Sequence, residues 1–202
     1  MTPAAQVFSA SEILQEILNG KRVDLLLKQW SKSNRYAGSK DRHAIRDFVY
    51  NGLRNKRSAL SKIKAPQSGR NWAIGVLIEA NKDLNKYFND EAYSSSSLTI
   101  EEKQAIQKAT ESTKPPDVEL NVPAFLWPIW NADLGAEAEN IAKNLCERAP
   151  AFLRVNLQRT SIPKVQDILL EDNIHTEQHP SVQTALIITS GQNKIKNCIA
   201  FR

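Results

Sequence analysis

Glycine is scarce in this sequence, with 7 residues among 202, and these are spread along the chain. No Gly-x-Gly-x-x-Gly pattern occurs, and no glycine-rich loop ends in Lys-Ser or Lys-Thr. In such loops, backbone N–H groups bind the phosphates of a nucleotide. This sequence has too few glycines close together to form a loop of that kind. We therefore expect no cofactor-binding site in this chain.

Cysteine and histidine are equally sparse. Cys146 and Cys198 lie far apart and match no metal-binding spacing, so we expect reduced thiols. His175 and His179 have the i, i+4 spacing that suits zinc on a helix, but Pro180 opposes a helix there and no third ligand is near. Neither cysteine has a neighbour placed to lower its pKa, and no serine lies in a nucleophile-elbow context. These patterns predict neither a metal site nor a catalytic nucleophile.

Long apolar runs are absent as well. No stretch of 18 or more apolar residues occurs, so we expect no membrane-spanning helix and no membrane partner. The first 20 residues have no basic start followed by an apolar block, which is the pattern of a secretory signal. The sequence therefore predicts a cytoplasmic protein.

Charge, by contrast, is distributed very unevenly. Residues 1–70 contain 14 Lys and Arg against 5 Asp and Glu, whereas residues 71–140 contain 5 against 12. Residues 141–202 contain 8 against 5, and the whole chain has a net charge of +5. A basic front favours a partner that is a polyanion, although a solvated helical surface can be equally basic.

Apolar spacing predicts a run of helices up to residue 148. Ser39 is expected to cap the third of them, and Thr99 with Glu102 forms a capping box for a later one. Pro123 is expected at the first position of a further helix, with Pro128 bending it. The predicted helices cover residues 3–19, 23–32, a stretch from 39 past 53, 70–81, 99–112, a short one after 123, and 136–148.

The pattern changes at Pro150. Residues 151–156 alternate as in a strand, Ser161 can cap a helix to Glu171, and residues 173–177 and 184–189 read as two more strands. Strands and a helix after an all-helical run predict a second, small unit. We expect a mainly α-helical bundle, residues 1–135, followed by a small α/β domain, residues 136–202.

The clearest functional pattern is the segment from Asn34 to Arg46. It concentrates cations near the start of the third helix, with one aromatic residue among them. Cations neutralise phosphates, helix N-termini offer free N–H groups, and a tyrosine can stack on a base. The alternative is structural, since Asp41 and Arg42 can bridge helices and Tyr36 can belong to the core. As a group, the segment favours RNA, and its candidate contacts are Arg35, Tyr36, Lys40, Arg42 and Arg46.

Two stretches resemble a known family. Ala37-Gly38-Ser39-Lys40-Asp41-Arg42, with Ile45-Arg46-Asp47, Val49-Tyr50 and Leu53-Arg54 after it, resembles the NusB-like N-terminal domain of Sun-type (RsmB) RNA cytosine-5 methyltransferases. A second stretch resembles the junction to the small α/β domain of that family. Its centre is Glu147-Arg148-Ala149-Pro150, which runs into Leu153-Arg154-Val155-Asn156. Pro123 to Trp130 and Gly135 precede this centre, and Arg159-Thr160 follows it. The similarity covers essentially the whole chain.

This resemblance implies an RNA-binding helical domain, then the small domain, then a catalytic domain. In the full-length family the catalytic domain binds S-adenosylmethionine and uses two cysteines, one of which attacks C6 of cytosine. Neither Cys146 nor Cys198 matches the motif of those cysteines, and the chain ends about where that domain would begin. We therefore expect substrate recognition without catalysis, in a truncated form of the enzyme.

Two functions remain open at this point. The first is binding of RNA, most simply ribosomal RNA, through the cluster above, with Arg154 and Arg159 as weaker candidates. The second is a NusB-like protein-interaction module that is not an enzyme. In that case the acidic middle of the chain, with Trp127 and Trp130, would form the contact surface for a protein partner.

Overall fold

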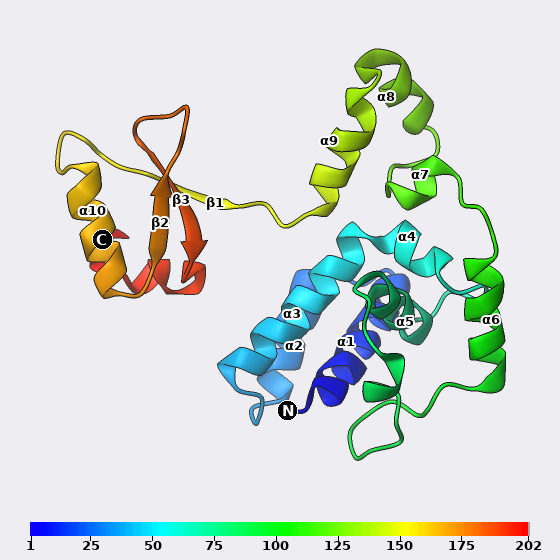
Figure 1. The fold of residues 1–202 in the computed structure, drawn as a ribbon. Coiled ribbons are helices and arrows are strands. Elements are labelled where there is room, and N and C mark those ends of the chain that lie inside the picture. The colour runs from blue at the N-terminus through cyan, green and yellow to red at the C-terminus, as the bar shows by residue number, and fades with distance from the viewer. Residues whose placement is uncertain (202) are drawn as a thin grey trace. The chain divides into compact units, whose positions relative to one another are not determined.

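The computed structural model describes residues 1–201, which divide into two compact units, residues 1–147 and the residues from 148 onward (Figure 1). The first unit is helical and the second contains a three-stranded sheet, which confirms the expected fold class. Contacts divide the chain after Glu147 and not after residue 135, because helix α9 (Glu137–Cys146) contacts α8 and α3. Within residues 1–201, no helix has the length and apolarity needed to cross a bilayer.

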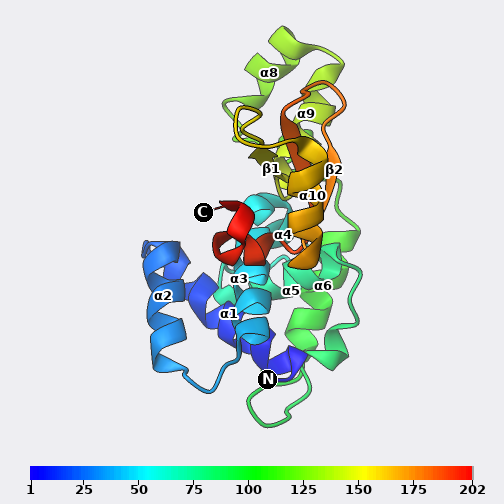
Figure 2. The same cartoon turned by 90° about the vertical axis from the view of Figure 1, so that its left-hand side faces the viewer.

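Helices α1, α3 and α5 form the centre of the first unit, where each contacts the other two (Figure 1). Helix α2 lies at its margin (Figure 2). The elements of this unit are α1 (Pro3–Leu18), α2 (Val23–Ser33), α3 (Ser39–Arg54), α4 (Lys56–Ser61), α5 (Gly69–Glu79), the 3-10 turn η1 (Leu84–Lys86), α6 (Ile100–Thr110), α7 (Pro116–Glu119), α8 (Trp127–Leu134) and α9.

The core of this unit is built on α5, as its apolar sequence predicts. Trp72 and Ile74 are fully buried, and the indole Nε1 of Trp72 donates to the backbone oxygen of Gly52, 3.0 Å away. Gly75 lets α5 approach α4 closely, since a Cβ at this position would lie 1.9 Å from the backbone oxygen of Ala59. This close packing fixes α3 and α4 against the centre of the bundle.

Several helix boundaries differ from the expected ones. Gly38, not Ser39, is the N-cap of α3, and its N–H donates to the Asp41 carboxylate. The short helix α7, which begins at Pro116, is not among the predicted helices. Pro123 lies before α8, which starts at Trp127, so Pro128 occupies the first turn instead of bending the helix. Proline fits that turn because its missing N–H would have no partner there.

The second unit is a small antiparallel sheet with one long helix. Its elements are β1 (Ala151–Arg154), α10 (Ile162–Glu171), β2 (His175–Gln178), β3 (Ala185–Ser190) and the 3-10 turns η2 (Gln192–Asn197) and η3 (Ile199–Phe201). Strand β3 lies between β1 and β2 and pairs antiparallel with both, with Ala151 opposite Ile188. Leu169 of α10 packs with Leu186 and Ile188 in a separate core.

Candidate nucleic-acid interface

The connection between α2 and α3 presents the predicted basic cluster to solvent. Arg35 and Lys40 are exposed, and Tyr36 is 73% exposed, so its ring is not part of the core. The loop is nevertheless ordered by hydrogen bonds. Asn34 Nδ2 donates to the backbone oxygen of Trp30 (2.9 Å), and the Tyr36 hydroxyl donates to Asn34 Oδ1 (2.9 Å). These contacts hold the aromatic ring at the surface, close in the chain to the two exposed cations.

Asp41 is the acidic residue inside this cluster, and the fold of the chain already engages it. Its carboxylate accepts hydrogen bonds from Gln6 Nε2 (2.9 Å), from the N–H of Gly38 (3.0 Å) and from the amino group of Met1 (3.2 Å). The bond from Gln6, followed by that from Gly38, lowers the pKa of Asp41. Asp41 therefore ties α3 to α1.

Arg42 and Arg46 lie one turn apart on α3. Arg42 is half-buried, and its Nε donates to the backbone oxygen of Ala37, 2.9 Å away, which fixes the side chain across the start of the helix. Arg46 Nε lies 3.7 Å from Asp47 Oδ1, and both side chains are more than 40% exposed. An ion pair this open and long contributes little, so Arg46 can still turn toward a phosphate.

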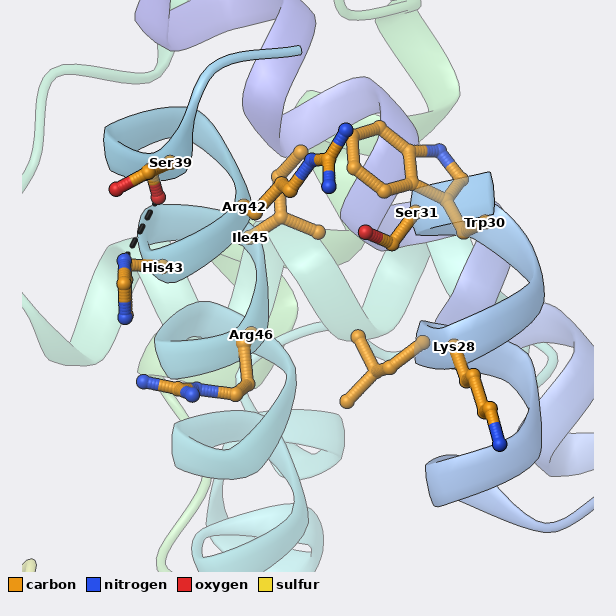
Figure 3. A pocket seen from close by; sticks show the side chains of 9 residues that line it. Lys28, Trp30, Ser31, Ser39, Arg42, His43, Ile45 and Arg46 are labelled. Atoms are coloured by element: carbon orange, nitrogen blue, oxygen red, sulfur yellow. Dashed lines mark hydrogen bonds between the residues drawn. The ribbon is translucent and has the colours of Figure 1, made fainter. Parts of the chain in front are cut away.

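A pocket of about 360 Å³ lies between α2 and α3 beside this cluster (Figure 3). Figure 3 shows Arg42 reaching from α3 toward Trp30 on α2, while Lys28 on α2 and Arg46 on α3 lie on opposite sides of the pocket and point away from each other. The lining residues are Leu27, Lys28, Trp30, Ser31, Ser39, Arg42, His43, Ile45 and Arg46, with no acidic side chain among them. The pocket thus combines an apolar base with a basic rim.

His43 stands at the α3 side of this pocket. Its Nδ1 lies 2.7 Å from the backbone oxygen of Ser39, and a carbonyl oxygen can only accept, so Nδ1 carries the hydrogen. In a neutral imidazole with this tautomer, the other ring nitrogen, Nε2, can accept a hydrogen bond.

The structure thus brings Arg42 and Arg46 together with three residues that the sequence did not single out for binding, Lys28, Trp30 and His43. Spacing along the chain gives no signal for Lys28 and Trp30, because both belong to α2. Only the packing of α2 beside α3 shows that they line the same pocket as the arginines.

Arg154 and Arg159 lie in the small unit. Both are exposed, Arg154 at the end of β1 and Arg159 in the loop that follows. Both line a cavity of about 500 Å³, whose apolar wall includes Val165 and Ile168 of α10. The structure therefore brings these two cations together, five residues apart in the sequence, over one apolar wall.

The two thiols are packed side chains. Burial is the largest influence on each and raises the pKa of both Cys146 and Cys198, which disfavours the thiolate needed for nucleophilic attack. Cys198 is 1% exposed, and Cys146 Sγ donates to the backbone oxygen of Leu120 at 3.6 Å. Their surroundings do not fit the catalytic cysteines of a methyltransferase.

The surroundings of the histidines, cysteines and acids also bear on whether the chain could hold a metal ion or a cofactor. Across residues 1–201 there is no group of three or more His, Cys, Asp or Glu side chains that could hold a metal ion. The ring nitrogen Nδ1 of His179 accepts from the N–H groups of Ser181 and Val182, both at 3.1 Å, so it serves a turn. Nor do the described residues provide a glycine-rich loop that would fit S-adenosylmethionine.

The comparison with protein families gives a match in the C-terminal part of the chain. Residues 122–194 match the family model described as Methyltr_RsmF/B-like, ferredoxin-like domain, a stretch that includes α8 and α9 as well as the sheet. No curated protein matches the sequence. For these residues, the expected family resemblance is confirmed at the level of an RsmF/B-like ferredoxin-like domain.

Among solved structures, the crystal structure of PH0851 is similar in fold. The superposition has a TM-score of 0.55 at 15% sequence identity and covers 100% of this chain. It covers 52% of PH0851, so this chain spans about half the length of that protein. At this identity the likeness concerns the fold alone.

Proposed function

We propose that this chain, which carries the ferredoxin-like domain of the RsmF/B-like methyltransferases, binds ribosomal RNA in the cytoplasm as the substrate-recognition part of an S-adenosylmethionine-dependent cytosine-C5 methyltransferase. In this proposal the helical unit is a NusB-like RNA-binding domain. The chain itself supplies recognition and no chemistry, because its two thiols are packed and their raised pKa values disfavour the thiolate.

One observation carries the proposal. Arg35 and Lys40 are exposed in and beside the α2–α3 connection, Arg42 and Arg46 line the pocket next to it, and the nearby Asp41 is engaged with α1 and the cap of α3. Cations release counterions when they bind phosphates, and this release is a major source of RNA affinity. Tyr36 adds an exposed ring on which a base can stack.

The test is the salt dependence of RNA binding. Binding of a fluorescent single-stranded RNA by the purified chain is measured by anisotropy over a range of salt concentrations. The double variant Lys40→Ala and Arg42→Ala should bind more weakly, and its slope of log affinity against log salt should flatten by about 0.7 for each phosphate that the variant no longer neutralises.

The matched control replaces two lysines of the acidic middle. Lys103 and Lys108 are exposed on α6, so Lys103→Ala with Lys108→Ala removes the same charge from the chain. This control should keep the slope of the wild-type protein. An equal slope in both double variants would refute the assignment of the RNA site.

A second candidate function rests on a different surface. Phe125 is 76% exposed just before α8 and Ile129 is 52% exposed on it, while Trp127 and Trp130 are half-buried alongside. Exposed apolar groups in an acidic region favour a protein partner. Binding of a defined partner protein that is abolished by Phe125→Ser with Ile129→Ser, in a preparation that binds no RNA, would favour this second function.

Catalysis is tested directly. Transfer of a methyl group to RNA by the purified chain, supplied with S-adenosylmethionine, would contradict the non-catalytic part of the proposal.

A further inference from the structure

The pocket between α2 and α3 has a shape that phosphate binding alone does not need. Leu27, Trp30 and Ile45 form its apolar base, and the cations stand around them (Figure 3). Binding of phosphates alone would require only the cations at the rim of the pocket, and no apolar base. Its volume of about 360 Å³ lies at the lower end of the range for small-molecule sites, roughly 300–1,000 Å³.

Of three acids near the pocket, two are engaged elsewhere and one forms a long, exposed ion pair with the pocket residue Arg46. Asp24 accepts a hydrogen bond from the Tyr50 hydroxyl at 2.7 Å, Asp41 is bound to Gln6 and Gly38, and Asp47 lies beside Arg46 at 3.7 Å. None of the three lines the pocket. Lys28 and Arg42 have no carboxylate partner within the described part of the chain. The pocket therefore suits a ligand with an apolar, planar body and negative charge beside it.

We propose that this pocket receives one unstacked nucleobase of a single-stranded RNA segment, with the flanking phosphates on Lys28 and Arg46. The proposal rests on the proposed RNA-binding function and specifies its substrate class. The base would lie against Trp30, and the Ser31 hydroxyl would offer a hydrogen bond to its edge.

Single-stranded RNA fits this geometry better than a duplex. Bases in an A-form helix are stacked, and the deep, narrow major groove keeps side chains from their edges, whereas loops and bulges can turn a base outward. A nucleotide turned outward carries its own phosphates to either side of the base. The two cations at opposite margins of the pocket match that arrangement.

The first experiment fills the pocket without removing a charge. Ser31 lines it, whereas Ser33 is exposed near the end of the same helix and does not, so Ser31→Trp and Ser33→Trp add the same ring inside and outside the pocket. Ser31→Trp should weaken binding of a short single-stranded RNA by about fivefold to a hundredfold, the range for one stacked base. Its salt slope should stay at the wild-type value, because the cations that bind phosphate remain. Ser33→Trp should bind as the wild type does.

The second experiment begins with the wild-type chain, so its main measurement does not depend on the folding of a variant. A series of single-stranded RNAs, each abasic at one position, should show a loss of affinity at one position in particular. That loss should disappear in Ser31→Trp, where no base can enter. The blunt duplex formed from the same RNA should bind more weakly than the single strand.

The possible outcomes distinguish a failure of the proposed RNA-binding function from a failure of the base-pocket assignment. If the wild-type chain shows no salt-dependent RNA binding, the proposed function fails and the pocket assignment with it. If it binds, and Lys40→Ala with Arg42→Ala weakens binding, but Ser31→Trp and the abasic series have no effect, only the base pocket is refuted. Binding of polyglutamate in place of RNA, blocked by Ser31→Trp, would identify the pocket as a site for acidic peptides and overturn the proposal.

Discussion

The Arg70 guanidinium holds both carboxylate oxygens of Glu102, with Nε 2.6 Å from Oε1 and Nη2 3.0 Å from Oε2. The same carboxylate accepts the N–H of Thr99 at 2.9 Å and so completes the N-terminal cap of α6. Arg70 belongs to the first turn of α5, and its guanidinium carbon also lies 4.7 Å from the centre of the Phe88 ring. One ion pair therefore joins the central helix of the bundle to the cap of a peripheral one.

This pair predicts a pH-dependent loss of stability. The bond to Arg70 lowers the pKa of Glu102 below its ordinary value of 4.5, so the stabilisation is fully present above about pH 4.5 and is lost as the pH falls through the folded-state pKa. Arg70→Ala should reduce the free energy of unfolding by about 1–3 kcal/mol at pH 7. Urea denaturation should show a smaller difference from the wild type at pH 3.

A second ion pair serves as the control. Lys143 pairs with Glu139 on α9, but these side chains are 60% and 59% exposed, so solvent screens them. Lys143→Ala should change the free energy of unfolding by less than about 1 kcal/mol at either pH. A deficit for Arg70→Ala that stayed constant from pH 7 to pH 3 would contradict the role given to Glu102.

Asn121 predicts a difference between two variants at one position. It has φ of 57°, and its side-chain oxygen accepts the N–H groups of Arg57 and Ser58 at 2.9 and 3.0 Å, which caps α4. Asn121→Gly should lose the cap at a cost of about 0.5–2 kcal/mol. Asn121→Ala should lose about 1 kcal/mol more, because alanine is strained at this φ. Thermal or urea unfolding measures both, and equal stabilities would show that the conformation carries no strain.

Much of the helical unit follows from local sequence. The capping box of Thr99 and Glu102 forms as the spacing predicts, and the apolar residues of α5 are buried around Trp72. Both depend on residues within a few positions of one another, where spacing alone decides which side chains meet.

Contacts across longer separations could not be read in this way. The N-cap of α3 moves from Ser39 to Gly38 because Asp41 bonds back to the Gly38 N–H while also holding Gln6 of α1. Likewise, Lys28 lines one pocket with Arg42 only because α2 packs beside α3. The binding roles of Arg35, Tyr36, Lys40, Arg42 and Arg46 in the helical unit, and of Arg154 and Arg159 in the small unit, stay predictions.

Substitution of Tyr36 should change RNA binding without changing the stability of the fold. Its ring is 73% exposed and its hydroxyl contacts only the neighbouring Asn34 among the described residues, so Tyr36→Ala should leave the melting temperature nearly unchanged. RNA affinity should fall by about fivefold to a hundredfold, because the stacking surface is lost, while Tyr36→Phe should retain it. Tyr93, 85% exposed in the acidic segment, is the matched control, and Tyr93→Ala should bind RNA as the wild type does. Equal losses of RNA affinity in Tyr36→Ala and Tyr93→Ala would mean that neither ring stacks on a base at a defined site. The RNA interface would then consist of its cations alone.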